Sequence, residues 1–187
     1  AQFHRHELHL LDGDLRMDRY LERIAADAAQ GHSVLVCCNT VGRAQQVYDE
    51  LCRYLPDHAE RLLLHGGFNG RDRLEKENAV RAATGSQSSE RRPIVLVATQ
   101  VVEVSLDIDL DVIFTDPAPL EALIQRFGRI NRRRKSKSAA VFVFSEPSDG
   151  QGVYEEDLVR ATLAVLVENS GHIIDEEAIS GWLDAVY

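Results

Sequence analysis

Apolar residues follow two alternating patterns along the chain, and each pattern predicts a different element. Short continuous apolar runs, typical of strands buried on both faces, occur at 33–38, 61–65, 94–98, 112–114 and 139–144. Between them, apolar residues recur every three or four positions, as in amphipathic helices, over 15–30, 41–55, 71–83 and 120–127. Strands that alternate with helices predict an α/β fold in which helices sandwich a parallel sheet.

The chain divides into three segments. Residues 15–145 carry the alternating pattern and form the main lobe, whereas 146–187 begin with a polar linker and continue into two amphipathic helices, which predicts a small helical appendage. Residues 1–14 are expected to form an entering strand or linker. Three histidines lie in this first segment: His4, His6 and His9. Because their spacing is not H-E-x-x-H, we favour the strand or linker over a metal site.

Charge and composition narrow the classes of function. The 187 residues are 44% apolar, enough for an ordinary buried core, and the formal net charge is −9. A protein this acidic is not expected to coat a polyanion, yet residues 126–137 hold seven basic side chains and no acidic one. This basic stripe favours a localised anion site. For its second half, 133–137, a flexible solvated loop is the open alternative.

The sequence also predicts the cellular compartment of the protein. No stretch approaches the ~20 apolar residues of a membrane span, and the polar N-terminal residues do not resemble a signal peptide, so we expect a cytoplasmic protein with no membrane partner. The cysteines are odd in number and lack C-x-x-C spacing: Cys37, Cys38 and Cys52. They predict neither a disulfide framework nor a zinc site, and a reducing compartment fits them.

The stretch Q-R-F-G-R-I-N-R, at 125–132, is the strongest candidate for chemistry. Gln125, Arg129 and Arg132 are separated by four and three residues, which on a helix places them on one face. We expect their polar ends to converge on one oxyanion, with Gly128 allowing the backbone to approach a ligand closely. The alternative is a basic helix end on a solvated surface.

Polar residues also stand at the carboxyl ends of predicted strands, where open α/β sheets bind ligands. They are Asn39, Thr40, His65, Gly66 and Thr99. For Asn39 and Thr40 a plain helix cap is the alternative interpretation. The glycines at 66–70 lack the G-x-x-x-x-G-K-[ST] spacing, so no phosphate-binding P-loop is encoded there.

Four segments, taken in order, resemble the second RecA-like lobe of superfamily 2 helicases: S-V-L-V-C-C-N-T, L-L-L-H-G-G-F, V-L-V-A-T-Q-V-V-E-V-S-L-D-I-D-L-D and Q-R-F-G-R-I-N-R. The last two, with the downstream V-Y-E-E-D-L-V-R-A-T-L, are most similar to the helicase-nuclease of type I CRISPR interference. The resemblance covers about 30–145. It implies that ATP lies between two lobes, the other of which carries the P-loop and the magnesium-binding carboxylates.

The resemblance also implies roles for individual residues. Arg129 and Arg132 match the arginine-finger element that reaches the γ-phosphate, and Gln125 matches the residue that orients the attacking water or that phosphate. Asp107, with Gly128 in the same nucleotide site, matches the carboxylate near the ribose or the magnesium shell. For Asp107, a turn residue capping local N–H groups is the open alternative. No role is assigned to Glu103.

On the nucleic-acid side, Thr99 matches the hydroxyl that grips a phosphate, while Asn39, Thr40, His65 and Gly66 line the single-strand track. The implied partners are single-stranded DNA, the first RecA-like lobe and nuclease domain of a parent chain, and the CRISPR guide-RNA surveillance complex. Because the 187 residues contain no Walker lysine motif, the nucleotide site is half present and the isolated chain is expected to be inactive. The alternative function is a non-catalytic RecA-like module that binds nucleic acid or a partner protein.

Overall fold

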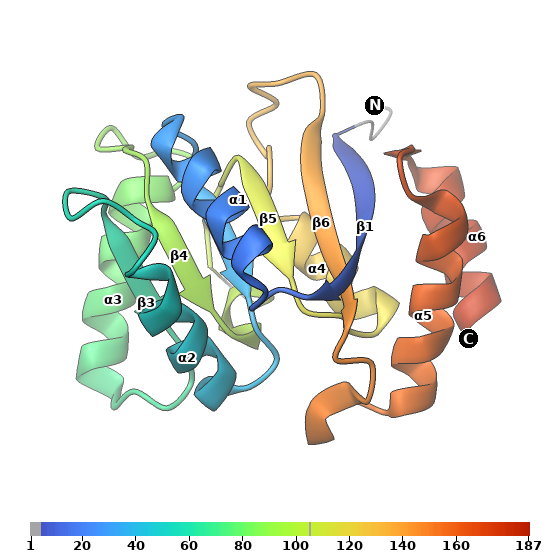
Figure 1. Cartoon of the computed structure of the whole chain (residues 1–187). Helices are drawn as coiled ribbons and strands as arrows, with labels where there is room; N and C mark the ends of the chain where they lie inside the picture. The colour runs from blue at the N-terminus through green and yellow to red at the C-terminus, as the bar shows by residue number, and fades with distance from the viewer. Residues whose placement is uncertain (1–4, 105) are drawn as a thin grey trace.

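The computed structural model describes residues 5–104 and 106–187 and contains a seven-stranded sheet (Figure 1). Its strands are β1 (His6–Asp14), β2 (Val34–Cys37), β3 (Arg61–Leu64), β4 (Val95–Ala98), β5 (Val112–Thr115), β6 (Ala139–Glu146) and β7 (Ile173–Ile174). The helices are α1 (Asp18–Ala29), α2 (Val41–Leu51), α3 (Gly70–Thr84), α4 (Leu120–Phe127), α5 (Glu156–Asn169) and α6 (Glu176–Val186), with short 3-10 turns η1 (Gln100–Val102) and η2 (Gly150–Gly152).

The strand order is β3-β4-β2-β5-β6-β1-β7, and every pairing is parallel except that of β1 with the short edge strand β7. All residues of β2, β4 and β5 are buried, as their continuous apolar runs predict for strands covered on both faces. The predicted α/β fold with a parallel sheet sandwiched by helices is therefore confirmed.

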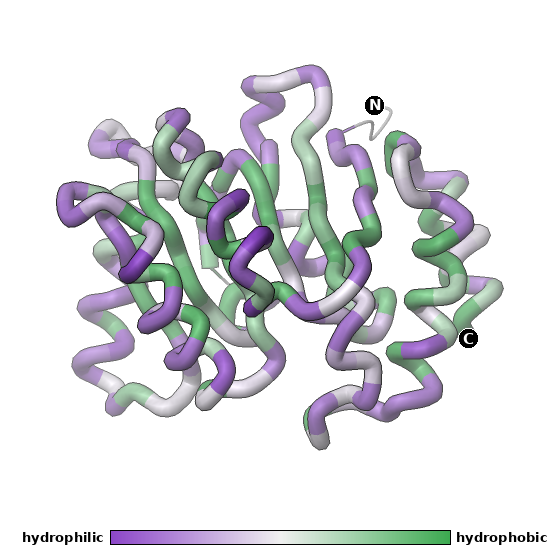
Figure 2. Tube along the Cα trace, viewed as in Figure 1, coloured by the Kyte–Doolittle hydropathy of each residue, from purple (hydrophilic) through white to green (hydrophobic). Residues whose placement is uncertain are grey.

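Two apolar layers hold the helices on the sheet. Leu21 and Ile24 of α1 and Val47 of α2 pack with one face of the sheet. On the opposite face, Leu123 of α4 and Trp182 of α6 belong to a second cluster. The strands form the hydrophobic centre in Figure 2, between the two helical layers. Each fully buried apolar side chain contributes about 1.5–3 kcal/mol to the stability of the fold.

Several boundaries differ from the sequence prediction. α1 begins at Asp18 and not at residue 15, because β1 continues as far as Asp14. β1 lies inside the sheet, with His6 opposite Ala139 of β6. The strand β7 was not predicted; its two residues pair with β1 between α5 and α6. The three segment boundaries stay a prediction, although α5 and α6 pack against the same sheet as the rest of the chain.

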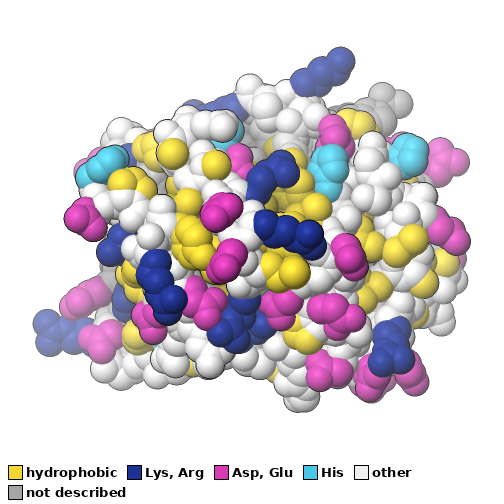
Figure 3. Space-filling model, viewed as in Figure 1, with side chains coloured by type: hydrophobic (Ala, Val, Ile, Leu, Met, Phe, Trp, Pro, Cys, Tyr) yellow, Lys and Arg dark blue, Asp and Glu magenta, His cyan; other side chains and the backbone are white. Residues whose placement is uncertain are grey.

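Two surface features bear on function. Acidic and basic side chains are interspersed over the face that carries α1 and α2, so that face presents no broad field of one sign (Figure 3). Within residues 5–104 and 106–187, none of the helices has the length and apolar character needed to cross a bilayer.

Candidate functional site

The carboxyl ends of β2, β3 and β4 meet at one edge of the sheet, as predicted. Cys37 and Leu64 both pair with Ala98, so the residues that follow these strands are neighbours. Three of the five candidates at this edge are buried, with exposed fractions of 1% to 4%: Asn39, His65 and Thr99. Gly66 is exposed and Thr40 is half-buried. Thr40 and Gly66 therefore offer the accessible surface, and the buried residues support it from beneath.

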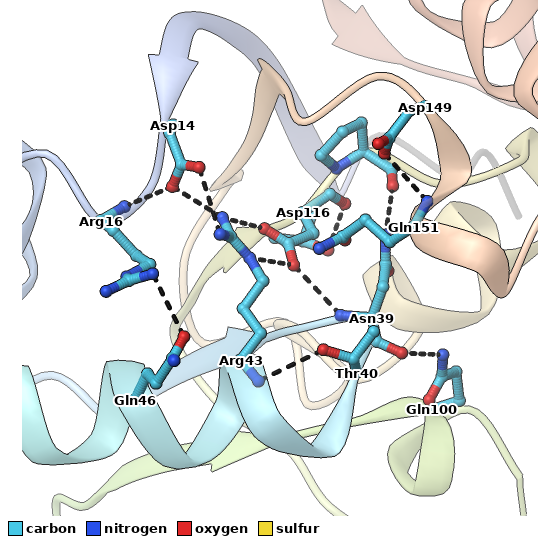
Figure 4. A network of polar contacts seen from close by, with 12 residues as sticks. Asp14, Arg16, Asn39, Thr40, Arg43, Gln46, Gln100, Asp116, Asp149 and Gln151 are labelled. Atoms are coloured by element: carbon cyan, nitrogen blue, oxygen red, sulfur yellow. Dashed lines mark hydrogen bonds and ion pairs between the residues drawn. The ribbon is translucent and has the colours of Figure 1, made fainter.

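A buried ion-pair network lies under this edge (Figure 4). Arg43 of α2 donates from Nε and Nη2 to the carboxylate of Asp116, at 2.7 and 2.8 Å, and also pairs with Asp14 at the end of β1. Burial works against the Arg43 charge, but the hydrogen bonds that Arg43 donates to both carboxylates raise its pKa above the ordinary value. Asp116 Oδ2 also accepts the Asn39 backbone N–H at 3.1 Å, and Thr40 caps α2. The network fixes the strand ends to one another.

Arg126 forms the centre of a second buried network. The side chain is fully buried and carries five N–H donors. These donate to Glu103 Oε1 (2.9 Å), Thr115 Oγ1 (2.8 Å), the Asp116 carbonyl (3.3 Å), Asn39 Oδ1 (3.0 Å) and the Tyr154 hydroxyl (3.1 Å). Burial opposes the charge, but neighbouring ionisable groups, including Cys37, Tyr154 and Glu103, raise the pKa of Arg126. Arg126 is thus a structural cation that joins β2, η1, β5 and the segment before α5.

Arg129 has a different environment. Its Nη2 donates to the Glu103 carbonyl at 2.7 Å and its Nη1 to the Leu106 carbonyl at 2.8 Å. Its Nε is buried and has no hydrogen-bond partner in the described part of the chain. Burial and the nearby Arg132 lower the pKa of Arg129 below its ordinary value. Arg129 therefore retains a cationic charge that no carboxylate of the described residues neutralises by direct pairing.

Arg132 and Asp107 form an exposed pair beside Arg129. Arg132 Nη1 lies 3.0 Å from Asp107 Oδ1, and the two side chains are 36% and 49% exposed. Ser86 donates to both Asp107 oxygens, and the Arg132 backbone N–H donates to Asp109 Oδ1 at 2.8 Å. Asp109 therefore caps the backbone N–H of Arg132, whereas Asp107 contacts the Arg132 guanidinium and the Ser86 hydroxyl. Both partners of the exposed pair are accessible to a ligand.

The predicted helical arrangement of Gln125, Arg129 and Arg132 is wrong. α4 ends at Phe127, because Gly128 forms its C-cap and the chain then turns through Asn131, whose φ is 52°. Gln125 is exposed and lines a groove of about 790 Å³ with Tyr154, Leu183 and residues of α4 and α5. Neither Arg129 nor Arg132 lines that groove.

Gly128 packs closely at the end of α4. It has the φ of an ordinary right-handed helix, −59°, and a Cβ there would lie 3.2 Å from the Gln125 carbonyl. It lines a small apolar cavity of about 210 Å³ with His6, Phe127 and Trp182. The structure therefore explains this glycine by close packing at the helix end, and the predicted approach of a ligand remains untested.

The arginine pair lies toward the amino-terminal end of β5. The Leu110 N–H donates to the Arg129 carbonyl at 3.0 Å, and Leu110 and Ile130 form a parallel bridge just before β5 begins. Asn39 and Thr40 lie at the opposite edge, beyond the end of β2. The candidates thus form two surfaces, which Arg126 and Glu103 connect through α4 and η1.

Sequence reasoning missed the residues that connect these surfaces: Arg43, Glu103, Asp116, Arg126 and Tyr154. One signal was available for Arg126, which follows Leu123 by three residues and precedes Phe127, on the apolar face of α4. A cation on a core-facing position requires buried partners. Those partners come from distant segments, so periodicity alone did not identify them.

The histidines near the N-terminus do not form a metal site in the part that the structure describes. His6 is buried, and its Nε2 donates to the Ile130 carbonyl at 2.9 Å. His9 lies 2.9 Å from Glu7. His4 lies outside the described residues. Among those described, no group of three or more His, Cys, Asp or Glu side chains is arranged to hold a metal ion.

Comparison with known proteins identifies the family. Residues 30–135 match the family described as CRISPR-associated nuclease/helicase Cas3, C-terminal. The chain belongs to this Cas3 C-terminal family. It is 33% identical over 179 residues to the CRISPR-associated endonuclease/helicase Cas3 of Escherichia coli K12, covering 89% of the chain and 20% of that relative. The resemblance to the second lobe of a superfamily 2 helicase, of the type I CRISPR helicase-nuclease, is thereby confirmed.

Solved Cas3 structures share the fold. The T. fusca Cas3–ADP structure superposes with a TM-score of 0.86 at 29% identity, over 98% of this chain and 24% of that one. A chain in a structure described as a CRISPR RNA-guided surveillance complex, pre-nicking, gives a TM-score of 0.78 at 29% identity, over 97% of this chain and 25% of that one. The chain spans about a fifth of the length of curated Cas3 relatives.

Proposed function

We propose that the chain is the C-terminal lobe of an ATP-dependent single-stranded DNA translocase in type I CRISPR interference. The observation that carries this proposal is the contrast between two arginines of one motif. Arg126 donates all its N–H groups within the fold, whereas Arg129 keeps a buried Nε without a partner and has no paired carboxylate among the described residues. An orphaned buried donor costs about 1–3 kcal/mol, so each one in a native structure calls for an explanation, and at Arg129 an anionic ligand is the explanation that we propose.

The donor set near Arg129 fits a phosphate group. Arg129 and Arg132 supply guanidinium groups, which bind phosphate oxygens in a planar, bidentate manner. The exposed Asp107 stands beside them, suited to a ribose hydroxyl. Bound ATP would supply the γ-phosphoryl group, and the two arginines would stabilise the charge that develops on it. Magnesium would be held mainly by the first lobe, since the described residues of this chain offer no carboxylate cluster for it.

The carboxyl edge of β2, β3 and β4 is the proposed DNA track. The Thr40 hydroxyl and the exposed backbone at Gly66 would contact phosphates, with the Thr99 segment beside them. Asn39 and His65 would shape this edge from below, because they are 1% and 4% exposed. Contacts to phosphate position a strand without reading its sequence, which is the requirement for translocation.

The chain would work with partners that it does not contain. We propose a first RecA-like lobe and a nuclease domain in the same polypeptide, since the chain spans only 20% of its E. coli relative. Recruitment to a guide-RNA surveillance complex is supported by the likeness to the chain in such a complex. Purified alone, these 187 residues should hydrolyse no ATP above background, because no Walker lysine is present.

The test compares arginine variants in the full-length protein that carries this chain. Arg129→Ala and Arg132→Ala should each lower DNA-stimulated ATP turnover strongly, by up to the ~10³–10⁵-fold seen for arginine fingers. Arg133→Ala is the matched control: Arg133 is the next residue, is exposed, and should leave turnover unchanged. Binding of single-stranded DNA is measured in parallel. If both variants keep full turnover while DNA still binds, the lobe acts as a non-catalytic binding module and the finger assignment fails.

A further inference from the structure

Glu103 is the residue of the loop after β4 to which the proposed function gives no role. It caps η1, its backbone N–H donates to the Gln100 carbonyl at 2.9 Å, and its side chain is 15% exposed. The carboxylate faces Arg126 and the carbonyl faces Arg129. One residue therefore contacts both arginines, the structural one through its side chain and the candidate finger through its backbone.

These contacts close a ring of hydrogen bonds. Glu103 Oε1 accepts from Arg126 Nε at 2.9 Å, the Arg126 carbonyl accepts from the Arg129 N–H at 3.0 Å, and Arg129 Nη2 donates back to the Glu103 carbonyl at 2.7 Å. Arg126 is fully buried and is held in addition by the ends of β2 and β5. Because Arg126 is buried and held by these strand ends, the ring ties the Glu103 backbone and the Arg129 guanidinium to them.

The ring also explains how Arg129 keeps its position without a carboxylate partner. A direct carboxylate would neutralise the guanidinium and compete with an anionic ligand. Backbone carbonyls orient the guanidinium while leaving its net charge, and the Glu103 charge is taken up by Arg126 instead. The Glu103 carboxylate thus acts on Arg129 indirectly, because it holds Glu103 in place and makes no direct pair with Arg129.

Building on the proposed function, we infer that Glu103 is a positioning residue: its carboxylate pins its own backbone to Arg126, so that the Glu103 carbonyl aims Arg129 at the bound phosphate. The Tyr154 hydroxyl, from the segment before α5, accepts a hydrogen bond from Arg126 Nη2 and is not part of the ring. Loss of the Glu103 carboxylate frees the Glu103 carbonyl that orients Arg129, whereas loss of the Tyr154 hydroxyl leaves that carbonyl in place.

The kinetic test uses the full-length protein with Glu103→Gln and Glu103→Ala. A misplacement of about 1 Å in a catalytic group costs about 10²-fold in rate, so Glu103→Ala should lower kcat by about that factor. Glu103→Gln retains an oxygen acceptor for Arg126 Nε and should lose less. The KM for ATP should stay within about threefold, as expected when only transition-state contacts are lost. The matched control is Glu121→Gln on α4, whose exposed carboxylate forms no ion pair among the described residues and should leave kcat unchanged.

A double-mutant cycle decides whether Glu103 acts through Arg129. If it does, Glu103→Ala combined with Arg129→Ala should be no slower than Arg129→Ala alone. Losses that multiply would overturn the inference, as would a kcat for Glu103→Ala equal to that of the unmodified protein. Should Glu103→Ala fail to fold, the same cycle is run with Glu103→Gln, whose shape is nearly unchanged.

A second readout needs no turnover. Hydrogen exchange in the nucleotide-free protein should be faster at the Glu103 amide in Glu103→Gln than in Glu121→Gln, because the side-chain anchor is weakened. Equal exchange in the two variants would contradict the ring. If Arg129→Ala and Arg132→Ala both keep full ATP turnover, the proposed function fails, but the exchange experiment still tests the ring, so the two failures are distinguishable.

Discussion

Replacing Arg126 with alanine should destabilise the fold far more than any other arginine change in its motif. The substitution leaves the Glu103 carboxylate and the side-chain oxygens of Asn39, Thr115 and Tyr154 without their donor. Breaking a buried ion pair by removing one partner costs about 3–5 kcal/mol. Because domains are stable by only about 5–15 kcal/mol, the loss is a large fraction of the total.

The loss in the free energy of unfolding can be measured by urea unfolding of this chain, monitored by circular dichroism. In thermal unfolding of a domain of this size, a loss of about 3–5 kcal/mol lowers Tm by roughly 6–20 °C. Arg160→Ala is the control, since Arg160 pairs with Glu156 on one face of α5 and the side chains are 62% and 47% exposed. An exposed pair of this type contributes at most about 0.5 kcal/mol.

Arg129→Ala supplies the internal comparison. It removes two hydrogen bonds to backbone carbonyls, but it also removes a buried Nε that has no partner, and these effects oppose each other. We expect a net cost of about 1 kcal/mol. If Arg129→Ala destabilised the chain as much as Arg126→Ala, or if Arg126→Ala cost less than about 1 kcal/mol, the division between a structural and a ligand-facing arginine would be refuted.

Three further changes have defined outcomes. Burial lowers the pKa of His6 from 6.5 to about 4. Since the unfolded chain binds this proton more tightly, the free energy of unfolding should fall by about 3 kcal/mol as the pH falls from 6.5 to 4. His6→Gln should remove this pH-dependent component, whereas His58→Gln, at an exposed position, should not. Arg132→Ala should change Tm by less than about 2 °C, because its partner Asp107 is exposed. Gly13→Ala should cost about 1 kcal/mol or more in urea unfolding, because φ there is 94° and the new Cβ would lie 2.7 Å from the Met17 sulfur.

The sequence predicts the central strands well because their signal is local. The runs at 34–37 and 95–98 are apolar at every position, and in the structure each is buried throughout. β1 carries a weaker signal, with alternating polar and apolar residues, and its place inside the sheet depends on pairing with β6. His6 lies opposite Ala139, far away in sequence, and no local pattern encodes that register.

The candidate site was predictable in its composition but not in its geometry. The strand ends at Thr40 and Gly66 lie at one edge because parallel strands share their carboxyl edge. The helical spacing of Gln125 and Arg129, in contrast, presupposes a helix that continues, and α4 ends at Phe127. Where a helix ends depends on packing around its last turn as well as on propensity, so the spacing indicated the wrong face.

The end of α4 explains why three arginines of one motif have three different environments. On a continuous helix, Arg126, Arg129 and Arg132 would follow one another along a single face and meet similar surroundings. Because the helix stops between the first and the second, Arg126 points into the core, Arg129 lies half-buried against the carbonyls of Glu103 and Leu106, and Arg132 is exposed beside Asp107. The charge most deeply buried is also the one with every donor satisfied, as the cost of an unpaired buried cation requires. The motif is therefore anchored in the core by its first arginine, and the second and third are the ones that the proposed function assigns to an anion.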